Sequence, residues 1–136
     1  MKTNFAFGLA TLSLGALLSV TMLVHAQQSG ITRTDLVQED LGTPGLQVVQ
    51  ARVGIAPGAT AARHSHPGEE VAYVLEGRIE YQIDGKPPVV LNAGDALFIP
   101  AGAVHGARNL DDKAPATELA TYVVPRGKPL VIPAAP

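Results

Sequence analysis

GATAARHSHPGEEVAYVLEG, residues 58–77, carries the strongest structural signal in this chain, and it is matched by GDALFIPAGAVHGARN, residues 94–109. Together the two segments contain three histidines and one glutamate: His64, His66, Glu70 and His105. Residues i and i+2 of a strand project from the same face, so the first two rings can point at one position. Glu70 has the same parity, although a bulge at the intervening Pro67-Gly68 bend would shift it. His105 can join them only through the fold, as inward side chains of a closed sheet do.

Three imidazoles and one carboxylate suit one divalent transition metal, with Fe, Mn, Cu, Ni and Zn as the candidates. The chain has no cysteine, which excludes a thiolate site, a thiolate nucleophile and a disulfide framework. In an octahedral site four protein ligands leave two positions open for water, substrate or dioxygen. Such a metal acts as a Lewis acid on a chelating enol, enediol or carboxylate, and a redox-active metal can also bring dioxygen to it. Glu70 is the one candidate acid or base within the ligand set.

The composition of the 136 residues narrows the class of protein. Apolar residues make up 46% of the chain and charged residues 16%, so it is not disordered by composition. The 10 basic and 12 acidic residues give no basic surface for nucleic acid, and aromatic residues, at 4%, are too few for base stacking. We therefore expect a small molecule, rather than a nucleic acid, as the partner.

The first 26 residues predict a secretory signal peptide. Lys2 precedes a mostly apolar run over residues 5–24, and Val24-His25-Ala26 is a small-residue cleavage signal, so we expect cleavage after Ala26. An uncleaved membrane anchor is the alternative, because the run approaches the ~20 residues that a spanning helix needs. Cleavage would leave a periplasmic or secreted protein with no membrane segment.

The rest of the chain predicts one all-β domain. We divide it into a lead segment, residues 27–45, with a short turn over 34–41; a β-barrel, residues 46–125; and a Pro-rich tail, residues 126–136. Short strands with alternating apolar residues are expected in the following places: 46–56, 71–75, 78–83, 89–91, 96–99, around His105, and 117–124. Glu76-Gly77 and Asp84-Gly85 predict tight hairpins. Short strands separated by frequent turns indicate an antiparallel sandwich or barrel.

The two segments resemble the two signatures of the cupin superfamily. The first reads G-x5-H-x-H-x3-E-x6-G from Gly58 to Gly77, and the second reads G-x5-P-x-G-x2-H-x3-N from Gly94 to Asn109. Both match without a departure, and the short spacer is similar to that of small single-domain cupins. The resemblance implies an antiparallel double-stranded β-helix, or jelly-roll barrel, with the metal inside. It also implies the metal ligands His64, His66, Glu70 and His105, and a homodimer through edge strands.

The remaining polar and aromatic candidates are given structural roles. Glu69 is expected to be a solvated charge, and Asn109 and Asp95 to form turns. Four aromatic residues are expected in the core or the pocket wall: Tyr73, Tyr81, Phe98 and Tyr122. The inward positions otherwise read as Val, Ile, Ala, Leu and Tyr, with no second carboxylate suited to a dyad.

The function that we expect is that of a small-molecule metalloenzyme, dioxygenase-like, acting on a chelating enol or enediol. An isomerase or lyase of the same family is an alternative. So is a periplasmic cupin that binds a metal or small ligand without catalysis, and a purely structural barrel is a weaker one. A cupin that uses its histidines without metal is also open, although the intact Glu70 argues against it.

Overall fold

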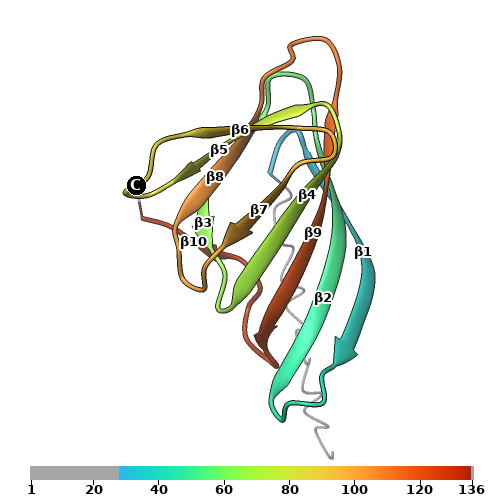
Figure 1. The fold of residues 1–136 in the computed structure, drawn as a ribbon, viewed down its shortest axis with the longest axis vertical. Helices are drawn as coiled ribbons and strands as arrows, with labels where there is room; N and C mark the ends of the chain where they lie inside the picture. Colours follow the sequence, from blue (N-terminus) through green and yellow to red (C-terminus); the bar gives the residue numbers. More distant parts are fainter. Residues whose placement is uncertain (1–27, 136) are drawn as a thin grey trace, which may run out of the picture.

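The computed structural model describes residues 28–135, so the predicted signal peptide, residues 1–26, lies outside the described residues. The regular structure in this range is all β (Figure 1). The strands are β1 (Ile31–Asp40), β2 (Leu46–Ile55), β3 (Thr60–Ser65), β4 (Glu69–Glu76), β5 (Arg78–Ile83), β6 (Val89–Asn92), β7 (Ala96–Ile99), β8 (His105–Asn109), β9 (Ala116–Pro125) and β10 (Ile132–Pro133). Within residues 28–135 no helix has the length and apolar character that crossing a membrane requires.

The strands form two antiparallel five-stranded sheets, ordered β1-β2-β9-β4-β7 and β10-β3-β8-β5-β6. Figure 1 shows the sheets facing each other, with β1 and β2 extending the first sheet at one side. From β2 onward the chain changes sheet at every connection except the one between β5 and β6. This is the jelly-roll, double-stranded β-helix topology that the sequence predicted.

Of the two predicted hairpins, the one at Asp84-Gly85 is confirmed, since it joins the paired strands β5 and β6. The one at Glu76-Gly77 is wrong, because β4 and β5 belong to different sheets. Gly77 has a φ of 81°, and a Cβ there would lie 2.8 Å from the Cβ of Ala116. The turn is therefore a corner packed against the start of β9, which glycine alone fits without strain.

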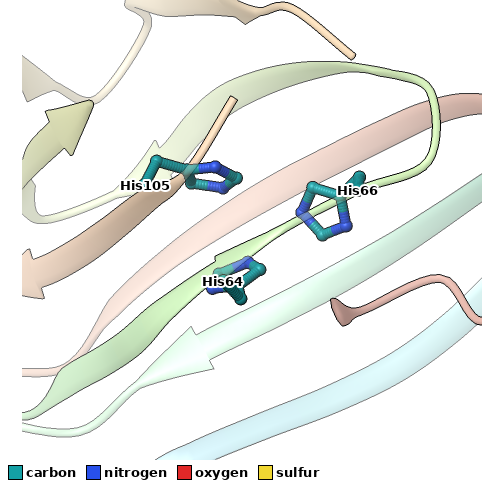
Figure 2. Close-up of side chains that lie close together, drawn as sticks. All are labelled: His64, His66 and His105. Carbon is teal, nitrogen blue, oxygen red and sulfur yellow. The ribbon is translucent and has the colours of Figure 1, made fainter. Parts of the chain in front are cut away.

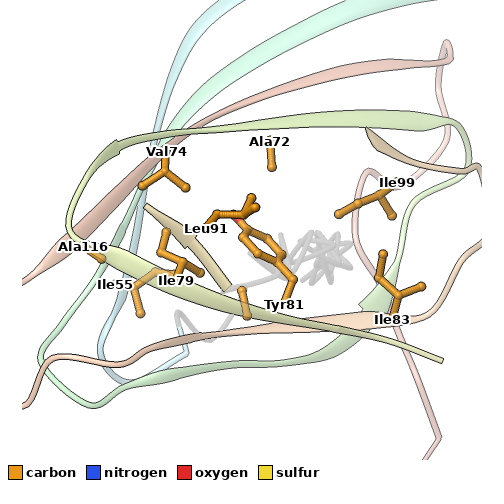
Figure 3. Packing of buried hydrophobic residues seen from close by; sticks show 10 residues of the cluster. Ile55, Ala72, Val74, Ile79, Tyr81, Ile83, Leu91, Ile99 and Ala116 are labelled. Atoms are coloured by element: carbon orange, nitrogen blue, oxygen red, sulfur yellow. The ribbon is translucent and has the colours of Figure 1, made fainter. Parts of the chain in front are cut away.

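Buried and exposed residues alternate along the strands, and the buried ones form the core between the two sheets. Together with Gln47 of the same parity, β2 buries the four predicted apolar residues: Val49, Ala51, Val53 and Ile55. The main cluster lies farther along the barrel, where Tyr81 reaches from β5 toward the opposite sheet on the side of Ala72 (Figure 3). Tyr81 and Tyr122 are buried as expected, but Tyr73 and Phe98 are 42% and 57% exposed. Tyr73 lies on the outer face of β4 and Phe98 on the outer face of β7. Both strands carry apolar residues on both faces, so alternation in the sequence did not show which face is buried.

Both ends of the described chain form edge strands. The short turn predicted over residues 34–41 is wrong, since β1 pairs with β2 along its length, with a bulge between Asp35 and Val37. Polar residues on both faces of β1 hid the strand and also suit an exposed edge. In the tail, β10 pairs with β3 and forms an edge of the second sheet. An edge position suits Pro133, because proline has no backbone N–H to donate to a further strand.

Candidate metal centre

The four predicted ligands come from β3, β4, β8 and the turn after β3. His64 and His105 face each other directly across the β3–β8 pair, and His66 lies just beyond the end of β3 (Figure 2). A bulge between Ala61 and His64 shifts the β3 register next to the site. Glu70 enters from the opposite sheet, where its register partner on β9 is Tyr122. The centre therefore bridges the two sheets.

The turn between His66 and Glu70 depends on Gly68. A Cβ at this position would lie 2.0 Å from the carbonyl oxygen of Val123 on β9, so any side chain would clash with backbone. The bend lets the chain pass from β3 to β4 close against β9. As a result Glu70 keeps the inward direction of the two preceding histidines, while Glu69 is exposed as predicted.

The side chains converge at close range. The ring centroids of His64, His66 and His105 lie 4.4 to 5.2 Å apart, and one ligand nitrogen from each ring lies within 4.8 Å of the others. The Oε2 atom of Glu70 is 3.1 Å from Nε2 of His66 and 3.2 Å from Nε2 of His105. His66, Glu70 and His105 are each no more than 3% exposed.

Each imidazole is oriented by a backbone carbonyl. The Nδ1 atoms of His64, His66 and His105 contact the carbonyl oxygens of Ala62, Leu130 and Ala103 at 2.7, 2.6 and 3.0 Å, respectively. A carbonyl oxygen only accepts, so Nδ1 carries the proton and donates it. This leaves Nε2 of each ring as the atom that can bind a metal, and such outer contacts are typical of metal-binding histidines.

The residues fit a bound cation. Nε2 of His66 and Oε2 of Glu70 are buried and have no hydrogen-bond partner, although they lie 3.1 Å apart. Two electron-rich atoms held this close need a proton or a cation beside them. Ligand atoms about 2.1 Å from a shared ion and at right angles would stand about 3.0 Å apart, close to the separations observed. A divalent metal would satisfy both unpaired atoms.

The electrostatics agree with this reading. Burial opposes the charge on Glu70, but the rings of His105 and then His66 outweigh it and lower the pKa of Glu70 to about 2. Burial lowers the pKa of His64 and so favours the neutral ring that a metal requires. At His105 burial also opposes the charge, but contact with Glu70 prevails and raises the pKa. The ionised Glu70 thus draws a positive charge into the centre.

The centre has three further neighbours: Tyr122, which was expected in the core or the pocket wall, and Arg33 and Leu130, which were missed from the sequence. The ring of Tyr122 lies 4.7 Å from that of His66, and the guanidinium of Arg33 lies 5.4 Å from the Tyr122 ring. Leu130 supplies the carbonyl that orients His66, so the tail strap, residues 130–134, supports the site. No sequence signal identifies a backbone acceptor 64 residues away.

A second buried carboxylate, Glu118, was missed when the inward positions were read as Val, Ile, Ala, Leu and Tyr. It is 6% exposed and accepts a hydrogen bond from the hydroxyl of Tyr81. The available signal was its position on β9, where it occupies the buried parity between Ala116 and Ala120. The predicted turn formers do organise turns: Asp95 accepts from the N–H of Asn92, and Asn109 holds the loop after β8.

Comparison with known proteins places these features in a family. A family model described as a cupin domain matches residues 51–122, which is more than half of the chain. Germin-like protein subfamily 2 member 2 of Arabidopsis thaliana is 31% identical over 125 residues, covering 88% of this chain and 54% of the relative. Dimethylsulfoniopropionate lyase DddQ of Ruegeria pomeroyi is 42% identical over 48 residues, covering 35% of this chain and 24% of the lyase. The chain thus spans about half, or less, of these relatives.

Solved structures show the same fold. The crystal structure of DddQ from Ruegeria pomeroyi has a TM-score of 0.63 at 25% identity, covering 76% of this chain and 51% of that one. An oxalate oxidase structure has a TM-score of 0.63 at 26% identity, covering 80% and 57%, respectively. With the matched domain, the jelly-roll topology and the buried histidine cluster together, the chain is a member of the cupin family.

Proposed function

We propose that this cupin is a metal-dependent enzyme that acts on a small, oxygen-rich substrate able to chelate the metal through a carboxylate, enol or enediol. The observation that carries the proposal is the convergence of three imidazoles, whose ligand nitrogens lie within 4.8 Å of one another beside Glu70, with every Nδ1 committed to a carbonyl. Four residues would hold the ion: His64, His66, Glu70 and His105. A divalent transition metal would supply Lewis acidity there and, if redox-active, a route to dioxygen.

The chain's own residues divide the remaining work. The carbonyls behind the three rings fix their direction, so the site needs little rearrangement to accept an ion. Glu70 contributes the one negative charge, leaving a net positive charge on a divalent centre that attracts an anionic chelate. The apolar side chains of Ile83 and Ile99, register partners of His105 and Glu70, limit water around the site.

Two matched proteins support a small acid as substrate. One is named an oxalate oxidase and the other a dimethylsulfoniopropionate lyase, and both names specify a small carboxylate. The first reaction is an oxidation, which fits a dioxygenase-like chemistry. The second is an elimination, which keeps the lyase alternative open. A non-catalytic metal- or ligand-binding role is the further alternative.

The test is turnover by the metal-loaded protein. Protein reconstituted separately with Mn²⁺, Fe²⁺, Cu²⁺, Ni²⁺ and Zn²⁺ is assayed with dicarboxylates, catechols, β-diketones and enediols, following dioxygen uptake and product formation. We expect turnover with a redox-active metal and its loss in Glu70→Ala, while Glu69→Gln, the exposed neighbour, retains it. Product formation without dioxygen uptake would favour the lyase. Metal binding without turnover of any substrate would favour the non-catalytic role.

Self-association is a further part of the proposal, as the family resemblance implies. The outer face of β4 and β7 supports it, because Val71 and Phe98 are exposed register partners there. Light scattering of wild type and of Phe98→Asp tests it. A dimer that the substitution dissociates is the expected result, and a monomeric wild type would contradict it.

A further inference from the structure

Glu118 and Tyr81 form a buried polar pair that metal ligation does not use. Glu118 lies on β9 of one sheet and Tyr81 on β5 of the other, and the tyrosine hydroxyl donates to Oε2 of the carboxylate. They are 6% and 1% exposed, respectively. Removing an ionised carboxylate from water costs free energy unless it is paired with a charge and hydrogen-bonded. Within residues 28–135 its hydrogen-bonded partner is a neutral hydroxyl.

Tyr81 is the member of the pair nearer to the metal centre, because Glu118, the register partner of Val74, lies four residues along β9 from Tyr122, the register partner of Glu70. On β5, Ile83 is the register partner of His105, and Tyr81 is two residues away on the same inward face. Two residues of strand place it about 7 Å further along the barrel axis. The register partners of Tyr81 on the two neighbouring strands are Ala107 of β8 and Val89 of β6. On the side of the opposite sheet Tyr81 faces the small side chain of Ala72 (Figure 3).

The charges that surround Glu118 come from several strands. Burial raises the pKa of Glu118 to about 7, and the charge of Glu70 on β4 adds to the rise. The hydroxyl of Tyr81 on β5, His105 on β8 and Arg33 on β1 act in the opposite direction. Burial and the neighbouring Glu118 carboxylate raise the pKa of Tyr81, so its hydroxyl stays protonated at neutral pH. It can pass its proton to Glu118 only if its oxygen accepts a second proton at the same time. Glu118 can therefore exchange a proton near neutral pH.

We propose that the Glu118–Tyr81 pair accepts the proton that a hydroxylated chelating substrate gives up on binding at the metal centre. This inference rests on the proposed function and names its proton acceptor. The substrate O–H bond breaks, its electron pair stays on the substrate oxygen, and the proton passes to the oxygen of Tyr81. Tyr81 at the same time gives its hydroxyl proton to Oε2 of Glu118, forming a carboxylic acid. No electron is transferred, and the total charge inside the barrel is unchanged.

The test measures protons rather than turnover. Zn²⁺-loaded protein, which is redox-silent, is titrated with maltol, a hydroxypyranone that chelates metals after losing its hydroxyl proton. Calorimetry in buffers of different ionisation enthalpy gives the number of protons released per ligand at about pH 8, where Glu118, with a pKa of about 7, is mostly ionised. Oxalate, which arrives without a hydroxyl proton, is the control ligand. Glu80→Gln, on the same strand as Tyr81 but without a place in the pair, is the control variant.

Wild type and Glu80→Gln should release close to no protons with maltol, because the pair retains the proton. Glu118→Gln should release about one proton per ligand. Tyr81→Phe should do the same, and it keeps the test valid if Glu118→Gln folds poorly. Equal release by wild type and both pair variants, with Zn²⁺ and maltol bound, would overturn the inference while leaving the metal centre intact. Failure of wild type to bind Zn²⁺ would overturn the proposed function and the inference with it.

Discussion

Replacing Asn109 with alanine should lower the unfolding free energy of the metal-free protein by about 3 kcal/mol. Asn109 is fully buried at the end of β8. Its amide nitrogen donates to the carbonyls of Ala114, Ile55 and Ala56 at 2.8, 3.1 and 3.2 Å, and its amide oxygen accepts from the N–H of Asp111 at 2.9 Å. The side chain thus ties the loop after β8 to the end of β2.

The magnitude follows from what the amide can bond. Two amide hydrogens serve three carbonyls, so at most two full bonds are lost from that side, and the bond from Asp111 is a third. The carbonyl of Ala56 keeps a second donor, the N–H of Ala59. Three net bonds at about 1 kcal/mol each give the figure above, before any cavity term. The position is about 13 Å along the strand from His105, so metal affinity should change little.

Asn109→Asp is the matched variant, because it has nearly the same shape. It places one carboxylate oxygen against the three carbonyls, so the buried charge keeps only the N–H of Asp111 as a donor. We therefore expect Asn109→Asp to be less stable than Asn109→Ala at neutral pH. Urea unfolding followed by circular dichroism, with a chelator present, measures both. An alanine variant within about 1 kcal/mol of wild type, or an aspartate variant as stable as wild type, would refute the reasoning.

Three further results are expected. Burial raises the pKa of Glu118 from 4.5 to about 7, so the native state holds this proton more tightly than the unfolded state does. Its contribution to stability is complete below pH 4.5 and is lost as the pH rises through about 7. Over that range the unfolding free energy of metal-free wild type, measured by urea titration, should fall by about 3 kcal/mol relative to that of Glu118→Gln. A difference between the two proteins that stays constant with pH would argue against a buried Glu118 with a raised pKa. Deleting residues 130–136 removes the carbonyl that orients His66 and should weaken metal affinity about 10- to 100-fold in chelator competition, whereas deleting residues 135–136 should not. Metal occupancy should fall as the pH drops from about 6 to 5, since protons compete for the imidazoles, and occupancy that is constant over this range would contradict histidine ligation.

Much of the fold was predictable because alternation and turn residues are local. The parity of Val49 to Ile55 on β2 identified a half-buried strand, and the spacing of the histidines identified the resemblance to cupins. Turn residues do not say which sheet the next strand joins, so the corner at Gly77 read as a hairpin. Strands that are apolar on both faces, such as β4, do not say which face is buried. Export and cleavage after Ala26 stay predictions.

The surroundings of the candidate centre were less predictable than its ligands. The four ligand positions lie in two short segments, and the structure brings their side chains together. The carbonyl of Leu130 depends on where the tail returns to the barrel, which no local pattern encodes. Glu118 did carry a signal, because it is the one acidic residue on the buried parity of β9. An acidic residue on an apolar parity indicates a buried carboxylate and is worth weighing before the fold is known.

The most direct measurement is the metal content of wild type and His105→Ala after reconstitution and removal of loosely bound ions. We predict about one ion per chain in wild type and in Glu69→Gln, and almost none in His105→Ala, with the circular dichroism spectrum of the sheets retained. Stoichiometric, tight binding by His105→Ala would show that the imidazoles facing each other across β3 and β8 do not hold a shared metal ion.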